Sequence, residues 1–264
     1  MTWLRHIFFR IAVYTNIALR ARKRVPSPLG ERAGVRGGSH RKIGFLTFSI
    51  SLLLFPAACA NLPGLRPAEP SSAESRTAQC VSIFPAGRWQ FTHAIEFFPP
   101  DGSKQTLMGV LQISSQQRTF HCVMLTIEGM VLFEADYDGT GAVTIQRAIT
   151  PMDKPGMAEG MIQDILLIFF APVQPYTAAG FTESGAWICR YPSIDHGTED
   201  ILLRPEGTWQ INHYDARHNL LRTVNPMAGD HLKPNTPPSR IELIAHGLAG
   251  YRLRMSLVEA ASLK

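Results

Sequence analysis

Apolar and polar side chains alternate along most of the chain after residue 86, a period of two that is typical of strands with one buried face. Turn residues such as Pro99–Gly102 separate the runs. Because the runs are short and closely spaced, they indicate an antiparallel meander rather than alternating strands and helices. The pattern predicts about 11 strands, at Arg88–Phe98, Leu107–Ile113, Thr119–Ile127, Val131–Tyr137, Val143–Ile149, Ala186–Tyr191, Asp200–Arg204, Thr208–Tyr214, Asn219–Val224, Arg240–His246 and Tyr251–Leu257.

The period changes once, between the fifth and sixth of these runs. Residues Met157–Phe170 carry apolar side chains at intervals near four, with Pro155 before them and Pro172 after them. This spacing predicts a single helix with one broad apolar face. The polar side chains on this helix, Glu159, Gln163 and Asp164, are expected to face water.

A sheet of about 11 strands must curl, and its concave face needs a cover if the sheet does not close into a barrel. The predicted helix can supply that cover and would then enclose an apolar cavity able to hold a lipid without chemistry. The alternative is that the inward side chains simply fill a core. The candidate lining residues are Phe91, Ile95, Phe97, Leu111, Ile113, Leu132, Phe133, Leu166, Phe169 and Phe170.

A basic and then apolar segment precedes the strands. Arg41-Lys42 flanks the uncharged run Ile43–Phe55, which is short for a bilayer-spanning helix, and Ala57-Ala58 comes directly before Cys59. Residues 41–58 therefore predict a lipoprotein signal peptide, with Cys59 as the lipid anchor. Pro56 departs from the usual leucine of this motif, so an uncleaved anchor and ordinary cleavage after alanine stay open. All three alternatives export the chain after residue 60.

The segments on either side of this signal carry little apolar pattern. Residues 1–40 are interpreted as a non-structural extension that arises because translation begins downstream of Met1; the alternative is a basic amphipathic helix at Trp3–Arg22 lying on a membrane. Residues 59–78 are rich in Pro, Ser, Ala and Glu and predict a flexible linker. Residues 79–264 are expected to form one domain.

The charge of the chain changes once the leader is set apart. The whole chain has a formal net charge of +5, with 26 basic and 21 acidic residues. Residues 1–58 hold ten Lys or Arg and only Glu31 as an acid, so the remainder is mildly acidic, at about −4. Nucleic-acid binding requires clustered basic residues. The body of the chain therefore gives no reason to expect a nucleic-acid partner.

Three stretches of sequence carry a family resemblance: Thr126–Gly139, the Ile- and Leu-rich helix after Pro155, and the closing Ile241–Leu243 with Gly250–Leu253. Together they resemble an uncharacterised bacterial lipoprotein family, domain of unknown function 3261, whose members occur beside aryl-polyene biosynthesis genes. That family is similar to the outer-membrane lipoprotein receptor of the Lol sorting pathway and to its periplasmic carrier.

The resemblance covers residues 80–260 and implies an open antiparallel half-barrel, mainly β, whose apolar concave face is covered by one or two helices and accepts acyl chains. The chain departs from the family in having one clear helix and a long loop at Asn225–Ser239. With a single helix, the concave face of the sheet is expected to be covered less completely than in the family.

The motifs of common enzymes are absent from the sequence: there is no Gly-x-Ser-x-Gly, phosphate loop, His-Glu-x-x-His or Cys-x-x-Cys. His213 and His218 flank one predicted turn, with Asp215 between them, but the pair lacks a third ligand at the spacing of a metal site. Asp195-His196 has no nucleophile near it in sequence. His121 and Cys122 are neighbours on a strand and therefore point to opposite faces. We expect no enzyme activity, cofactor or metal; a thioesterase ranks third among the functions considered.

Three cysteines accompany Cys59, at positions 80, 122 and 189. In an oxidising compartment an odd number favours one disulfide and one buried thiol, with Cys80 bonded to Cys122 or to Cys189. Three buried reduced cysteines are the alternative.

Two classes of function follow from these observations and from the resemblance. The first is a monomeric protein, lipid-anchored at the periplasmic face of the outer membrane, that binds or transfers an acyl chain, lipid or lipoprotein. The second is a non-enzymatic interaction lipoprotein of an envelope complex with a filled core. An empty apolar cavity under the helix would favour the first class, and a packed interior would favour the second.

Overall fold

The computed structural model describes residues 62–67, 70–150, 152–153, 155–227, 236–247 and 250–264. The predicted extension at 1–40, the signal peptide at 41–58 and the anchor Cys59 lie outside the described residues. No helix in the described part of the chain has the length and apolar character needed to cross a bilayer.

One antiparallel sheet of 12 strands forms the body, in the order β5-β4-β3-β2-β1-β12-β11-β10-β9-β8-β7-β6. Two meanders, β1 to β5 and β6 to β12, are joined where the first strand pairs with the last. The strands are β1 Arg88–Phe98, β2 Gln105–Ser114, β3 Thr119–Thr126, β4 Val131–Tyr137, β5 Val143–Ala148, β6 Ala178–Phe181, β7 Trp187–Pro192, β8 Thr198–Leu203, β9 Trp209–Tyr214, β10 Leu220–Pro226, β11 Arg240–Ala245 and β12 Tyr251–Ser262, and the helices are α2 Pro70–Ser82 and α3 Pro155–Phe169.

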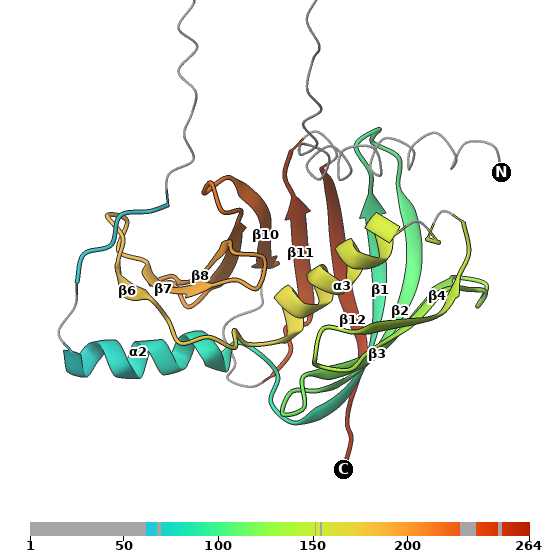
Figure 1. Cartoon of the computed structure of the whole chain (residues 1–264), viewed down its shortest axis with the longest axis horizontal. Coiled ribbons are helices and arrows are strands. Elements are labelled where there is room, and N and C mark those ends of the chain that lie inside the picture. The colour runs from blue at the N-terminus through green and yellow to red at the C-terminus, as the bar shows by residue number, and fades with distance from the viewer. Residues whose placement is uncertain (1–61, 68–69, 151, 154, 228–235, 248–249) are drawn as a thin grey trace, which may run out of the picture.

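The sheet curls but does not close, because its two edge strands, β5 and β6, stand at opposite ends of the strand order. Figure 1 shows the curved sheet with the helix α3 lying across its concave side. The expected fold class, a mainly β open half-barrel with covering helices, is confirmed. The strand that the sequence did not predict is β6, whose residues Ala-Ala-Gly-Phe alternate too weakly to be recognised as a strand.

Alternation along each strand decides which side chains face inward. Phe91 and Ile95 on β1 pair with Leu111 and Leu107 on β2, and Ile95 also pairs with Met255 on β12. Phe91, Leu111 and Met255 belong to one hydrophobic cluster that continues across the sheet, Ile95 packs against that cluster, and Leu107 is also buried. The inward face is therefore apolar over most of its width.

The helix α2 corrects the predicted linker, because residues 70–78 are helical rather than flexible. Pro70 begins the helix, where a missing N–H costs nothing. Cys80 is bonded to Cys189 on β7, and the Arg76 guanidinium lies over the Phe181 and Trp187 rings. These contacts with the sheet stabilise a segment whose own composition favours coil. Cys122 is the free cysteine of the described residues and is buried, so one of the two disulfide pairings left open by the sequence is realised.

Candidate functional site

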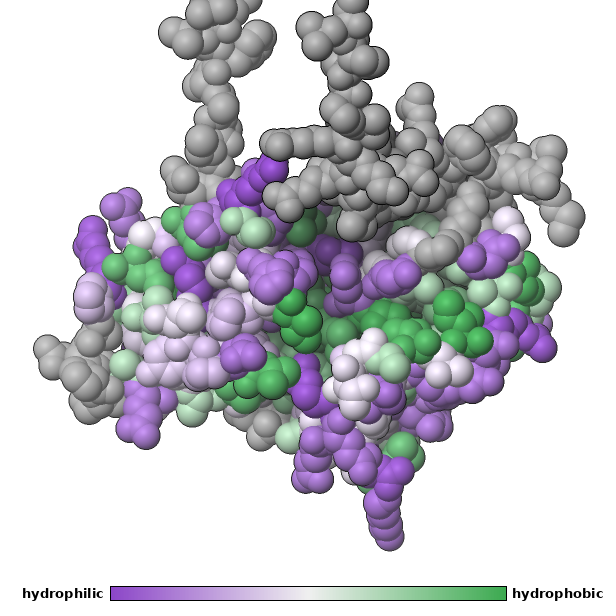
Figure 2. Space-filling model, in the orientation of Figure 1, coloured by the Kyte–Doolittle hydropathy of each residue, from purple (hydrophilic) through white to green (hydrophobic). Residues whose placement is uncertain are grey.

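A cavity of about 720 Å³ lies between α3 and the part of the sheet formed by β1 to β4 and β12. From α3, the side chains of Met157, Met161, Ile165 and Ile168 line it, and the opposite wall comes from inward residues of the strands. The helix has this position because it is part of the connection between edge strands β5 and β6, which carries the chain back across the concave face. In Figure 2 apolar side chains gather around α3 on this face of the molecule.

Half of the candidate lining residues border the cavity: Ile95, Phe97, Leu111, Phe133 and Phe169. Phe91, Ile113 and Phe170 are buried in the core instead and do not border the cavity.

The remaining two candidates, Leu132 and Leu166, are also placed away from the cavity. Leu132 precedes the inward residue Phe133 on β4, and consecutive strand residues point to opposite faces. Leu166 is half-buried against the hydrophobic core on the flank of α3. The broad apolar face of the helix thus divides between the cavity and the core.

One end of the cavity is polar. Asp164, from α3, accepts hydrogen bonds from the Nε of Arg222 on β10, at 2.5 Å, and from the hydroxyl of Tyr251 on β12. Asp164 is only 5% exposed, so the prediction that it faces water is wrong. Burial raises the pKa of its carboxyl, and the positive charge of Arg222 opposes that rise. This trio, the Asp164 clamp, fastens α3 to two strands of the sheet.

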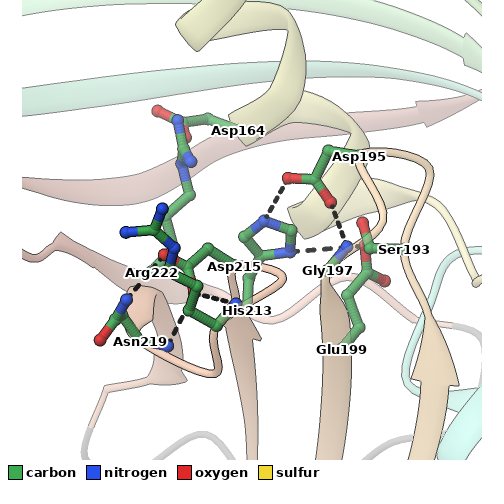
Figure 3. A network of polar contacts seen from close by, with 10 residues as sticks. Asp164, Ser193, Asp195, Gly197, Glu199, His213, Asp215, Asn219 and Arg222 are labelled. Carbon is green, nitrogen blue, oxygen red and sulfur yellow. Dashed lines mark hydrogen bonds and ion pairs between the residues drawn. The ribbon is translucent and has the colours of Figure 1, made fainter. Parts of the chain in front are cut away.

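A second polar cluster lies next to the clamp, as Figure 3 shows, with Arg222 reaching toward Asp164 and His213 facing Asp195. The His213 Nε2 donates to the Asp195 carboxylate at 3.0 Å, and this bond lowers the Asp195 pKa to about 2. Glu199 lies 3.8 Å from the Nδ1 of His213, and burial raises the pKa of this carboxyl. The cluster joins the β7–β8 turn to the inner face of β9.

His121 and Cys122 lie on opposite faces of β3, as the alternation predicts. His121 bonds to Asp136, and Cys122, on the other face of β3, borders the cavity. Burial raises the pKa of the Cys122 thiol to about 12, which makes it a poor nucleophile. Among the described residues there is no group of three or more side chains that could hold a metal ion.

Sequence reasoning missed four polar residues of the cavity wall: His93, Asp164, Arg222 and Tyr251. Two of them left a signal. His93 is an inward position of the alternating run in β1, between Phe91 and Ile95. Asp164 falls three residues after Met161 and four before Ile168, which places it within the apolar face of the helix. Arg222 and Tyr251 could be recognised only once the strand register was known.

The arrangement suits binding rather than bond-breaking chemistry. Most of the wall is hydrocarbon, and the Cys122 thiol is a poor nucleophile. The Asp164 carboxylate and the Arg222 guanidinium are bonded to each other. Such a cavity can sequester an apolar chain and interact with a small number of polar atoms on it.

No family model matches the chain, and no curated protein does. Two solved structures are similar in part. A LolA superfamily protein from Nitrosomonas europaea is 14% identical, with a TM-score of 0.44, over 73% of this chain and 94% of that one. A putative outer membrane lipoprotein-sorting protein domain from Vibrio parahaemolyticus is 11% identical, with a TM-score of 0.38, over 73% of this chain and 93% of that one.

Proposed function

We propose that this chain is an outer-membrane lipoprotein that binds an acyl chain, as part of a lipid or a lipoprotein, and passes it on in the bacterial envelope. The observation that carries the proposal is the apolar cavity under α3. Its volume of 720 Å³ falls within the range of about 300–1,000 Å³ typical of small-ligand sites.

The length of the cavity also fits an acyl chain. His93 and Tyr251 both border it. Because Phe98 pairs with Arg252, Tyr251 lies opposite the position that follows Phe98, six residues along the strand direction from His93. Six strand residues span about 20 Å. An acyl chain occupies about half of the 30 Å hydrocarbon thickness of a bilayer, roughly 15 Å. A chain can therefore lie lengthwise between α3 and the sheet.

The alternative, a filled interaction scaffold, describes only one half of the molecule. Under α2 the inner face is packed solid by side chains such as Trp187, Ile201 and Ile211, each no more than 1% exposed. Under α3 the same face leaves open volume. This asymmetry favours the lipid-binding function over the scaffold.

The anchor and the cellular context of the proposal come from the sequence. Cys59 after its leader supports lipid attachment, and the following Ala60 is consistent with sorting to the outer membrane. We propose a monomer that acts without catalysis or cofactor. The link to aryl-polyene-type lipid synthesis, and membership of the domain of unknown function 3261 family, are supported by the sequence resemblance.

Photochemical labelling in cells tests the proposal. Bacteria producing the full chain are grown with a palmitate that carries a diazirine in the chain and a terminal alkyne, and are then irradiated. We expect adducts on peptides from β1, β2 and α3. A separate product at Cys59 would report the anchor, and Cys59→Ser should abolish it.

A matched pair of variants on β2 makes the test specific. Gly109 borders the cavity, and a Cβ there would meet only the Ile95 side chain, with Cδ1 at 2.8 Å. Gly109→Leu should therefore narrow the cavity beside Ile95, block the path of an acyl chain and reduce labelling at least fivefold. Thr106→Leu adds a similar side chain at an exposed position of the same strand and should leave labelling unchanged. Absence of cavity adducts on the unmutated chain would refute the proposal.

A further inference from the structure

His93 is an unusual residue for the middle of an apolar wall. It borders the cavity on β1, is 2% exposed, and lies against the rings of Phe91 and Phe169 at centroid distances of 6.0 and 5.7 Å. Its Nε2 atom has no hydrogen-bond partner among the described residues. Burial lowers the pKa of this imidazole to about 4, so the ring is uncharged at neutral pH.

A buried polar atom without a partner is rare in native proteins and requires an explanation. Asp164, Arg222 and Tyr251 do not share the problem, because they satisfy one another. Glu159 and Gln163, which also border the cavity, are exposed to water. The unpaired Nε2 is therefore the point in the described wall where a hydrogen bond from a ligand would add most.

We propose that His93 donates an Nε2–H hydrogen bond to the uncharged ester carbonyl of a bound acyl group, so that the cavity selects esterified acyl chains over free fatty acids. This inference rests on the proposed function. Glycerophospholipids and the diacylglyceryl group of lipoproteins share the ester chemistry. With the carbonyl at His93, the hydrocarbon chain extends along Ile95 and Phe97.

The charges around the cavity explain the selection against a free fatty acid. A fatty-acid carboxylate is ionised at neutral pH, and a buried anion needs a compensating positive charge. In the described wall the cation is Arg222, which is already bonded to Asp164 at 2.5 Å. Glu159, at the exposed rim, adds a further negative charge. An ester carbonyl needs only a neutral donor, which His93 provides.

The photolabelling experiment on the full chain tests this inference through the mass of the adduct. Cells incorporate the diazirine palmitate into esters while some remains free, so both forms compete for the cavity. We expect esterified adducts to predominate, and their masses to distinguish a glycerophospholipid from a lipopeptide. His93→Phe, which keeps a ring of similar size without a donor, should reduce esterified adducts about fivefold, in line with the loss of one buried hydrogen bond. His93→Gln retains an N–H donor and should retain most of the labelling.

Each outcome has a distinct meaning. Cavity adducts composed mainly of free fatty acid would overturn the inference and leave the proposed function standing, as would equal ester labelling of the unmutated chain and His93→Phe. No cavity adduct on the unmutated chain would overturn both. Because the adduct mass is measured on the unmutated chain, the test of ester selection holds even if neither variant folds.

Discussion

A single carboxylate fixes the position of α3. The helix has a mostly apolar inner face, which by itself could slide or rotate over an apolar sheet. Asp164 removes that freedom, because its carboxylate is bonded to Arg222 on β10 and to Tyr251 on β12. The position of the cavity roof therefore depends on one buried ion pair.

Removing one partner of that pair should destabilise the fold. Asp164→Leu leaves the Arg222 guanidinium buried without its counter-ion, and breaking a buried pair in this way costs about 3–5 kcal/mol. Adding Arg222→Met removes the stranded charge and should recover much of the loss. Urea denaturation of the two variants measures the difference. Equal stabilities for the single and double variants would contradict the assigned role of the clamp.

His93 predicts a pH dependence of stability. Its pKa is about 4 in the folded chain and about 6.5 when exposed, so the unfolded chain binds more protons between these values. The contribution of this residue to the free energy of unfolding therefore falls as the pH is lowered from 6.5 to 4, by up to about 3 kcal/mol.

His93→Phe lacks the titrating group and should lose less stability than the unmutated chain over the same interval. Acids titrate in both proteins, so the difference between the two denaturation curves isolates the histidine. Parallel curves between pH 7 and pH 4 would show that His93 is not held neutral in the folded chain.

Single residues were the part of the site least accessible to sequence reasoning. Alternation identifies Phe91, Ile95 and Phe97 as inward residues but cannot tell that Ile95 and Phe97 border open volume. Phe91 instead contacts a helix side chain, because it stacks on Phe169 at 5.5 Å. That distinction depends on the height of α3 above the sheet, which the Asp164 clamp sets. Leu132 is different, because its place next to Phe133 already contradicted an inward assignment for both.

At the scale of elements, the strands were predictable because alternating apolar and polar residues within each strand show which of its faces is buried. Arg88–Phe98 and Val131–Tyr137 have the bounds that the sequence predicts. The helix α2 was not predictable in this way, because its stability comes from contacts distant in sequence. Thr77 and Cys80 lie on the same side of α2 as the partly buried Ala73, at intervals of four and three, but this stripe is too short to stand out from the sequence.

The disulfide should therefore dominate the stability of α2. Cys80 and Cys189 are separated by 109 residues, and closing a loop of that size stabilises a fold by about 2–5 kcal/mol. Replacing both cysteines with serine should lower the stability of the whole domain. It should also release α2 first, which would appear as faster amide hydrogen exchange in residues 73–82 than in α3. Similar protection of both helices in the variant would contradict this expectation.

At the scale of the whole molecule, the two edges of the sheet are treated differently. β6 is paired with Arg66 through two backbone hydrogen bonds and lies beside α2. β5 has no second partner strand among the described residues, and its Val143 and Ile145 are 38% and 47% exposed. Unprotected apolar edges favour association between sheets.

Ile145→Lys tests this difference between the edges. An exposed edge position contributes little to stability, so the free energy of unfolding should change by no more than about 0.5 kcal/mol. The added charge should reduce aggregation at high concentration, which light scattering measures. The same substitution at the buried Ile201 should unfold the domain, which separates the effect of the edge from that of charge.

The attachment of residues 62–67 has a consequence for how the molecule stands on a membrane. The Pro63 carbonyl accepts a bond from Arg190, and Arg66 is paired with Phe181, so the chain is fastened to the sheet almost as soon as it leaves Cys59. Four peptide units separate Cys59 from Pro63, the first described residue bonded to the sheet, and they reach about 14 Å at full extension. With the lipid on Cys59, as proposed, Pro63 and the Arg190 side chain that binds it stay within about that distance of the lipid-bearing cysteine. The β6–β7 end of the body is then held close to the lipid, and a protein delivering cargo from the periplasm would meet the molecule with that end near the membrane.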